Sequence, residues 1–347
     1  MKLEELLKKD NNNLDLFRLL AAVMVIYGHS YAIAPQPEHS DIVLRLLQHD
    51  YAGSLAVKLF FFLSGLVVTN SLLDKKSVRQ FVVTRFFRIV PGLLWVVLCC
   101  ALVLGPLVTE LPQPQYWSSS LTVDYMLDNA HLKTNYWLPG VFANNPHPSA
   151  VNGSLWTLPY EVGAYAGLLA LFMLGVFRSK VLAGLVLVLL LLDPVLGNKL
   201  LFTWRPVNRE LDYLLPCFAF GAMLAYLKNE ITIDARFVLG CLMLAWVFRI
   251  HAFGFLVFYV FAFACMVWVS GQTWFLRFKP KVDLSYGVYL WGFPVQQALV
   301  YWWPHAGVRF NQIAALVLAM GFAWISWHVV EKRGIALGRR LVGSLQS

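Results

Sequence analysis

Two ionisable residues, Arg18 and His29, lie within one apolar segment that is predicted to form a helix from residue 14 to residue 33. Eleven steps of about 100° place the two side chains roughly 20° apart on one helix face and about 16 Å apart along the axis. Guanidinium forks suit phosphate oxygens, and an imidazole, with an ordinary pKa of about 6.5, suits general base catalysis. We therefore interpret the pair as a candidate anion site aligned with a candidate base. The structural alternative is that Arg18 reaches the lipid headgroups and His29 caps the helix.

Arg85 and Arg88 form a second cationic group just before another apolar segment. Residues at i and i+3 are neighbours on a helix surface, so the two guanidinium groups would present paired forks to a phosphate. The alternative is ordinary anchoring of a membrane helix at its cytoplasmic end.

Glu161 lies about two turns into a further apolar segment and follows Pro159, which disrupts a helix. A carboxylate buried in such a segment needs a partner. Arg18, Lys58 and His29 are the candidates. Glu161 is therefore either a catalytic partner, for example one that orients His29, or one half of a structural ion pair.

The elements that must position these residues are membrane helices. The chain has 347 residues, of which 59% are hydrophobic and 14% charged, whereas soluble domains are about 45–50% apolar and about 25% charged. The apolar residues form blocks that approach the ~20 residues a helix needs to cross a bilayer. We predict an all-α transmembrane bundle of about ten spans, at residues 14–33, 52–73, 87–108, 155–176, 181–196, 211–227, 237–248, 253–270, 282–302 and 313–330.

The distribution of Lys and Arg indicates which way the bundle is oriented. With the N-terminus inside, nineteen of the 28 lie on the cytoplasmic side and seven, including Lys199 and Arg205, on the outer side; Arg18 and Lys58 lie within spans. Positive residues concentrate in cytoplasmic loops, so both termini are predicted to be cytoplasmic and the longest loop, about 109–153, extracytoplasmic. The net charge of +9 is explained by this bias and needs no nucleic-acid partner.

Several catalytic signatures are missing from the sequence. It contains no Walker-type phosphate loop, nucleophile elbow, nucleotide-binding glycine fingerprint or clustered His/Cys site. We therefore expect no metal, and ATP-driven transport, zinc proteolysis and serine hydrolysis lose support. Ser64-Gly65 is predicted to be a close helix contact rather than a nucleophile.

Six motifs together resemble the acyltransferase-3 family of bacterial integral-membrane O-acyltransferases, and they occur in the family's order across nearly the whole chain. They are Arg18 with ten residues to His29, Phe60-Phe61-Phe62-Leu63-Ser64-Gly65, Arg85-x-x-Arg88, Ser154-Leu155-Trp156-Thr157-x-x-x-Glu161, Ser285-Tyr286-Gly287-Val288-Tyr289-Leu290 and Glu331-Lys332.

The resemblance implies a multi-pass protein of the bacterial cytoplasmic (inner) membrane that takes an acyl group, usually acetyl, from cytoplasmic acyl-CoA. The acceptor would be a hydroxyl of an extracytoplasmic or lipid-linked glycan such as O-antigen or exopolysaccharide. It implies that Arg18, Arg85 and Arg88 bind the phosphates of acetyl-CoA and that His29 is catalytic. We expect a cytoplasmic segment at 1–13, an acyltransferase-3-like domain in contact with membrane lipid at 14–331, and a basic cytoplasmic tail at 332–347.

The sequence departs from the family pattern at two positions. Relatives often have a histidine before the late Phe-Pro, where this chain has Gly292, and many have an acidic or small residue at Lys58. A transporter or flippase for a glycan or lipid-linked intermediate is the alternative function, because it would use the same intramembrane charges as a substrate pathway. Transporters often have two related halves, and we find no such symmetry.

Overall fold

The structure is a computed structural model that describes residues 2–196, 209–251 and 253–343. Within these residues the regular structure is helical apart from two isolated β-bridges, so the prediction of an all-α protein is confirmed. Lys199 and Arg205, which entered the topology prediction, lie outside the described residues.

The chain forms two compact units. Unit 1 comprises Met1–Arg18, Val57–Lys76 and Val162–Val282, and unit 2 comprises Leu19–Ala56, Ser77–Glu161 and Asp283–Ser347. Unit 1 holds α1 (Leu3–Leu6), η1 (Lys9–Asn11), most of α4 (Ala52–Lys75) and of α9 (Leu158–Met173), η4 (Val176–Arg178), α10 (Lys180–Leu196), α11 (Arg209–Asp212), α12 (Leu214–Tyr226), α13 (Ala235–Phe248), α14 (Gly254–Ser270) and α15 (Thr273–Leu276). Unit 2 holds most of α2 (Leu14–Ile33), α3 (Ile42–Leu47), α5 (Val78–Cys99), η2 (Cys100–Leu104), α6 (Gly105–Val108), α7 (Gln113–Ser118), α8 (Ser120–Ala130), η3 (Gly153–Thr157), α16 (Ser285–Trp302), α17 (Gly307–Ser326), η5 (Trp327–Glu331) and α18 (Lys332–Gly343).

Each of the ten predicted spans overlaps a helix of the structure. Four helical segments of the described residues are long and apolar enough to cross a membrane: Leu14–Ile33, Ala52–Lys75, Val78–Val108 and Gly307–Gly343. Three further apolar helices, α12, α13 and α14, are shorter than the ~20 residues that a perpendicular crossing needs. The structure thus supports a membrane protein, while the count of ten spans and the cytoplasmic termini stay predictions.

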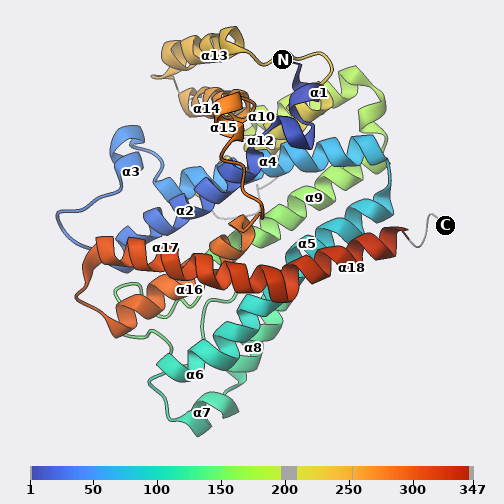
Figure 1. The fold of residues 1–347 in the computed structure, drawn as a ribbon. Coiled ribbons are helices and arrows are strands. Elements are labelled where there is room, and N and C mark those ends of the chain that lie inside the picture. Colours follow the sequence, from blue (N-terminus) through green and yellow to red (C-terminus); the bar gives the residue numbers. More distant parts are fainter. Residues whose placement is uncertain (1, 197–208, 252, 344–347) are drawn as a thin grey trace. The chain divides into compact units, whose positions relative to one another are not determined.

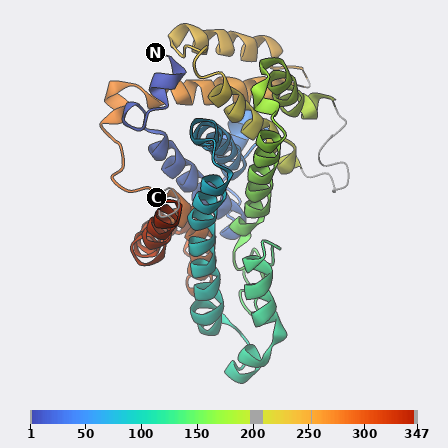
Figure 2. The ribbon, with the colours of Figure 1, turned by 90° about the vertical axis from the view of Figure 1, so that its right-hand side faces the viewer.

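The helix that carries Arg85 and Arg88 is longer than predicted. It begins at Val78, because the Ser77 hydroxyl caps the helix by accepting a hydrogen bond from the backbone N–H of Gln80. It passes Pro91 without ending and continues through the π-helical turn η2 to Val108. Figure 2 shows α8 alongside the far end of this helix.

Unit 1 contains the close helix contact predicted at Ser64-Gly65. A Cβ atom on Gly65 of α4 would overlap the backbone carbonyl of Phe218 on α12, and one on Gly221 would overlap the carbonyl of Phe62. Only glycine lets the two backbones approach this closely, which is how small residues pack membrane helices.

We expect Gly65→Val to lower the free energy of unfolding by about 3 kcal/mol, because the added side chain must push α4 away from α12. Gly167→Val on α9 is the matched control, since no atom lies within 4 Å of a Cβ at that position. Melting temperature in detergent measures both variants, and equal melting temperatures would contradict the close-contact interpretation.

Helix α16 is the buried centre of unit 2, and it forms an antiparallel hairpin with α17 (Figure 1). Its first turn is tied to α5, because the Tyr286 hydroxyl donates a hydrogen bond to the Ile89 carbonyl at 2.8 Å. Helix α18 lies directly on α5: Cβ atoms on Gly334 and Gly338 would come within 2.9 Å of Pro91 and Phe87, respectively.

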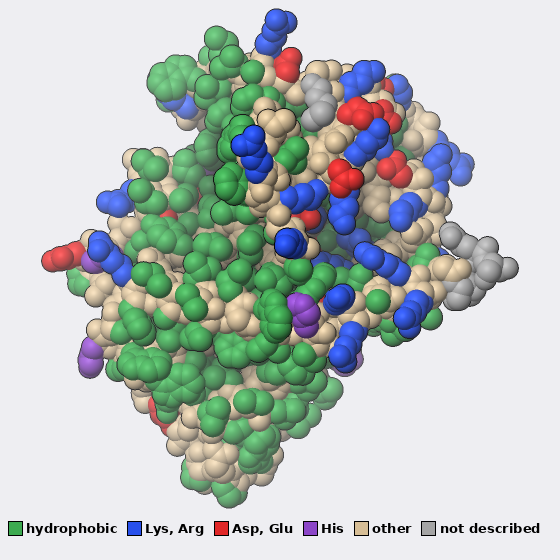
Figure 3. All heavy atoms as spheres, in the orientation of Figure 1, with side chains coloured by type: hydrophobic (Ala, Val, Ile, Leu, Met, Phe, Trp, Pro, Cys, Tyr) green, Lys and Arg blue, Asp and Glu red, His purple; other side chains and the backbone are tan. Residues whose placement is uncertain are grey.

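The surface of unit 2 changes character between α17 and α18. Over α17 the surface is mainly hydrophobic, whereas Lys and Arg side chains lie along α18 (Figure 3). The exposed cations of α18 are Lys332, Arg333, Arg339 and Arg340. This change is typical of a helix that leaves the hydrocarbon region at its basic end.

Candidate active site

A cavity of about 340 Å³ in unit 2 has His29 in its wall. This volume falls within the range of about 300–1,000 Å³ typical of small-ligand sites. The lining residues come from α2, the residue before α4, the loop after α8, η3 and α16, and they are His29, Ala32, Ile33, Tyr51, Tyr136, His147, Ala150, Gly153 and Phe293.

His29 lies near the end of α2, with its ring edge-on to Phe293 at 5.3 Å between centroids and tilted to Tyr51 at 6.4 Å. Its Nδ1 atom is buried and has no hydrogen-bond partner among the described residues. A buried polar nitrogen without a partner is costly in a packed interior. The ring therefore has hydrogen-bonding capacity for a molecule that enters the cavity.

Helix α16 positions the part of α2 that carries His29. Gln296 Nε2 donates a hydrogen bond to the Ile26 carbonyl of α2 at 2.7 Å. A Cβ atom on Gly292 would lie 2.7 Å from Ile26 Cγ1, so the two helices touch one turn before His29. This contact explains why the chain departs from the family pattern at Gly292, because a histidine at that position would force α2 and α16 apart.

A second histidine, His147, lines the same cavity and was not predicted from the sequence. Its ring is edge-on to Phe293 at 5.7 Å between centroids, so one phenylalanine ring contacts both histidines. The loop that carries His147 is clamped by Gln297, whose Nε2 donates hydrogen bonds to the carbonyls of His147 at 2.7 Å and Ala150 at 2.8 Å. The sequence feature that could have indicated His147 is the run Asn145-Pro146-His147-Pro148, in which two prolines restrict the backbone around one histidine.

Burial lowers the pKa of His147 below its ordinary value. The unfolded chain therefore takes up a proton at this residue at higher pH than the folded protein does, and stability falls as pH drops below about 6.5. We expect the melting temperature of the wild type to fall relative to that of His147→Gln between pH 7.5 and pH 5. Parallel melting curves for the two proteins would contradict this account of His147.

The segment that follows the loop forms the floor of the cavity. A Cβ atom on Gly153 would overlap the Phe293 ring, so the backbone lies against that ring. Asn152 Nδ2 donates a hydrogen bond to the Leu290 carbonyl at 3.0 Å. The Tyr289 hydroxyl donates to the Ser154 carbonyl at 2.8 Å. These bonds join η3 to α16.

Glu161 lies in the first turn of α9 and is not among the residues that line the cavity. It lies close enough to Tyr289 for an electrostatic interaction with that hydroxyl. Tyr289 is also 2.7 Å from Thr157 Oγ1. Glu161 therefore lies beside Tyr289, which supports the cavity floor. A direct role of Glu161 beside His29 stays a prediction.

Arg88 is held by carboxylates at the end of unit 2 where α18 begins. Its Nη2 atom lies 2.6 Å from Asp283 Oδ2, and Nη1 lies 4.0 Å from Oε2 of the buried Glu331. The guanidinium also lies over the Tyr286 ring, 5.7 Å from its centroid. The side chain remains 25% exposed, so it is fixed in orientation and still accessible. Arg85 lies one turn earlier on α5 and is half-buried.

Arg18 and Lys58 belong to unit 1. Arg18 pairs with Asp15 at 3.2 Å near the start of α2, and α2 runs unbroken from Leu14 to Ile33, which confirms the single helix on which the spacing to His29 was calculated. Lys58 is buried, and its Nζ atom lies 5.5 Å from the centroid of the Tyr259 ring.

Residues 11–328 match the family model described as the acyltransferase domain of acyltransferase-3 proteins. The chain belongs to this family and is therefore an acyltransferase enzyme. The match agrees with the resemblance that the motifs indicated.

The chain is 26% identical over 340 residues to a protein named O-acetyl transferase from Shigella phage Sf6, covering 93% of this chain and 96% of the relative, which supports an O-acetyltransferase. It is 33% identical over 162 residues to Nodulation protein 10 of Rhizobium leguminosarum bv. viciae, covering 44% of this chain and 42% of that protein. No solved structure matches the chain significantly.

Proposed function

We propose that the protein transfers an acetyl group from cytoplasmic acetyl-CoA to a hydroxyl of an extracytoplasmic or lipid-linked glycan, in the bacterial inner membrane. The family assignment favours this reaction over a transporter or flippase. The observation that carries the proposal is that one unit contains both a cavity with His29 and His147 in its wall and, at its basic end, a partly exposed guanidinium held by carboxylates.

In this proposal Arg85 and Arg88 bind the phosphates of acetyl-CoA, and the family resemblance implies the same role for Arg18. Guanidinium groups bind phosphate oxygens through paired N–H donors. Tyr286 contacts Arg88. Along α16, the seven residue steps from Tyr286 to Phe293 correspond to about 10 Å. A thin pantetheine arm can cover this distance, so the acyl end reaches the cavity while the phosphates stay at the boundary.

In the cavity, His29 acts as the general base. It accepts the proton of the acceptor hydroxyl while the oxygen forms a bond to the thioester carbonyl carbon. The carbon–sulfur bond then breaks, and the proton passes from His29 to the departing thiolate. His147, on the loop predicted to face outward, lies where the acceptor enters and is placed to accept a hydrogen bond from a sugar hydroxyl.

Mass spectrometry of surface glycans tests the proposal in cells. We expect O-acetylated glycan in cells that carry the wild-type protein and none in cells that carry an inactive variant. Identical glycan masses in the two strains would contradict a glycan acceptor.

A further inference from the structure

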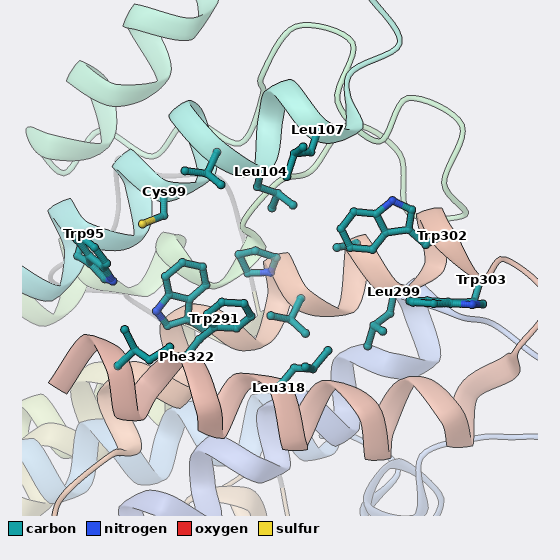
Figure 4. A pocket seen from close by; sticks show the side chains of 15 residues that line it. Trp95, Cys99, Leu104, Leu107, Trp291, Leu299, Trp302, Trp303, Leu318 and Phe322 are labelled. Atoms are coloured by element: carbon teal, nitrogen blue, oxygen red, sulfur yellow. The ribbon is translucent and has the colours of Figure 1, made fainter. Parts of the chain in front are cut away.

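Unit 2 contains a second hollow, an apolar groove of about 460 Å³ between the far end of α5 with η2 and α6, helix α16, and helix α17 (Figure 4). Figure 4 shows Trp95 and Trp291 at one end of the groove and Trp302 and Trp303 at the other. Its walls are aromatic and aliphatic side chains, with Cys99 among them. Such walls offer water almost no hydrogen bonds, so the groove suits hydrocarbon better than water.

The groove and the His29 cavity lie on two different faces of α16. Trp291, Pro294, Ala298 and Trp302 recur at helical spacing and line the groove. Phe293 and Gln297, on the other face, contact the cavity and the His147 loop. One helix thus separates the apolar groove from the His29 cavity.

The length of the groove matches one leaflet of a bilayer. The eleven residue steps from Trp291 to Trp302 span about 16 Å along α16, and half of a hydrocarbon core is about 15 Å thick. Trp302 and Trp303 are 48% and 54% exposed, and exposed tryptophans favour the membrane–water interface. A lipid chain in the groove would therefore have its headgroup at the level of these two residues.

That end of the groove is next to the loop that carries His147. The Tyr301 ring is 6.1 Å from the Phe142 ring of this loop and 6.3 Å from the Trp302 ring, between centroids. A headgroup at Trp302 would lie beside the segment that leads into the cavity.

We infer that the groove binds the hydrocarbon chain of a lipid-linked acceptor and so holds its saccharide headgroup at the entrance of the His29 cavity. This inference rests on the proposed function and selects the lipid-linked form of the acceptor. The groove contributes little binding free energy, because a chain gains little by moving from lipid to an equally apolar groove. Its effect is to position the headgroup, which then reaches the cavity more often.

The test compares the same saccharide on a long polyisoprenoid chain and on a short, water-soluble aglycone, with acetyl-CoA as donor and the full-length protein in detergent. Leu318 of α17 lines the groove, whereas its neighbour Val317 points elsewhere and is 66% exposed. Leu318→Trp fills the groove, and Val317→Trp is the matched control. Val103→Trp, at a second groove position that is 57% exposed, guards against a folding defect at Leu318.

We expect the wild type to use the long-chain acceptor with a KM at least about tenfold lower than that of the short one. Leu318→Trp and Val103→Trp should remove this preference, leaving the KM for acetyl-CoA and the use of the short acceptor unchanged, while Val317→Trp keeps it. Equal use of both acceptors by the wild type, or equal effects of Leu318→Trp and Val317→Trp, overturns the inference and leaves a bystander phospholipid as the occupant. Failure of the wild type on both acceptors overturns the proposed function and the inference with it.

Discussion

His29→Ala should abolish acetyl transfer, with a loss of about 10²–10⁴-fold, because the acceptor hydroxyl loses the base that accepts its proton. Binding of acetyl-CoA should be unchanged, since the arginine on the same helix lies about 16 Å away. Equilibrium binding and single-turnover transfer, measured on the same preparation, separate the two steps.

His29→Gln and His131→Ala are the controls for this result. Glutamine keeps much of the size of the side chain and cannot act as a base at neutral pH, so His29→Gln should be as inactive as His29→Ala. His131 is exposed at the end of α8 and is not among the residues of the cavity, so its replacement should be silent. Transfer at the wild-type rate by His29→Gln would remove the general-base role.

Replacing Arg85 and Arg88 together by alanine should raise the KM for acetyl-CoA by about 100-fold. A hydrogen bond to a charged group contributes about 1.5–3 kcal/mol. Two such bonds at the lower end of this range total about 3 kcal/mol, which corresponds to roughly 100-fold in affinity. The rate at saturating donor should change little, because neither residue lines the cavity. Initial rates over a range of donor concentrations give both constants.

Arg88→Lys and Arg79→Ala are the controls for the double replacement of Arg85 and Arg88. Lysine keeps the charge beside Asp283 and the buried Glu331 but lacks the fork, so Arg88→Lys should fold normally and still bind the donor weakly. Arg79 is exposed on the same helix, and Arg79→Ala should bind acetyl-CoA as the wild type does. An equal loss for Arg79→Ala would indicate a general charge effect.

The helices could be predicted because apolar blocks in a bilayer leave the backbone few choices. The ends of the helices were harder to predict. The hydropathy pattern predicts that the third span begins at residue 87, but Ser77 caps α5 ten residues earlier, and the helix continues past Pro91. Turns of helix outside the hydrocarbon carry no hydropathy signal, so the helix is longer than the span.

The site was only partly predictable, because residues outside the apolar segments do not stand out in the sequence. His29, Arg85 and Arg88 stand out because charged or titratable groups are rare in apolar sequence. His147 lies in a polar loop, where a histidine is unremarkable, and it reaches the cavity through hydrogen bonds with Gln297, a residue 150 positions away. Asp283 and Glu331 likewise meet Arg88 from distant parts of the chain, and no local spacing indicates either contact.

Transfer across a sealed membrane tests the central claim most directly. Uniformly oriented vesicles would receive labelled acetyl-CoA only on the side of Arg88 and α18, and glycan acceptor only on the other side. The account predicts labelled glycan in this arrangement with the wild type, none with His29→Ala, and none when donor and acceptor exchange sides. Labelled glycan that forms only when donor and acceptor share one side would contradict it.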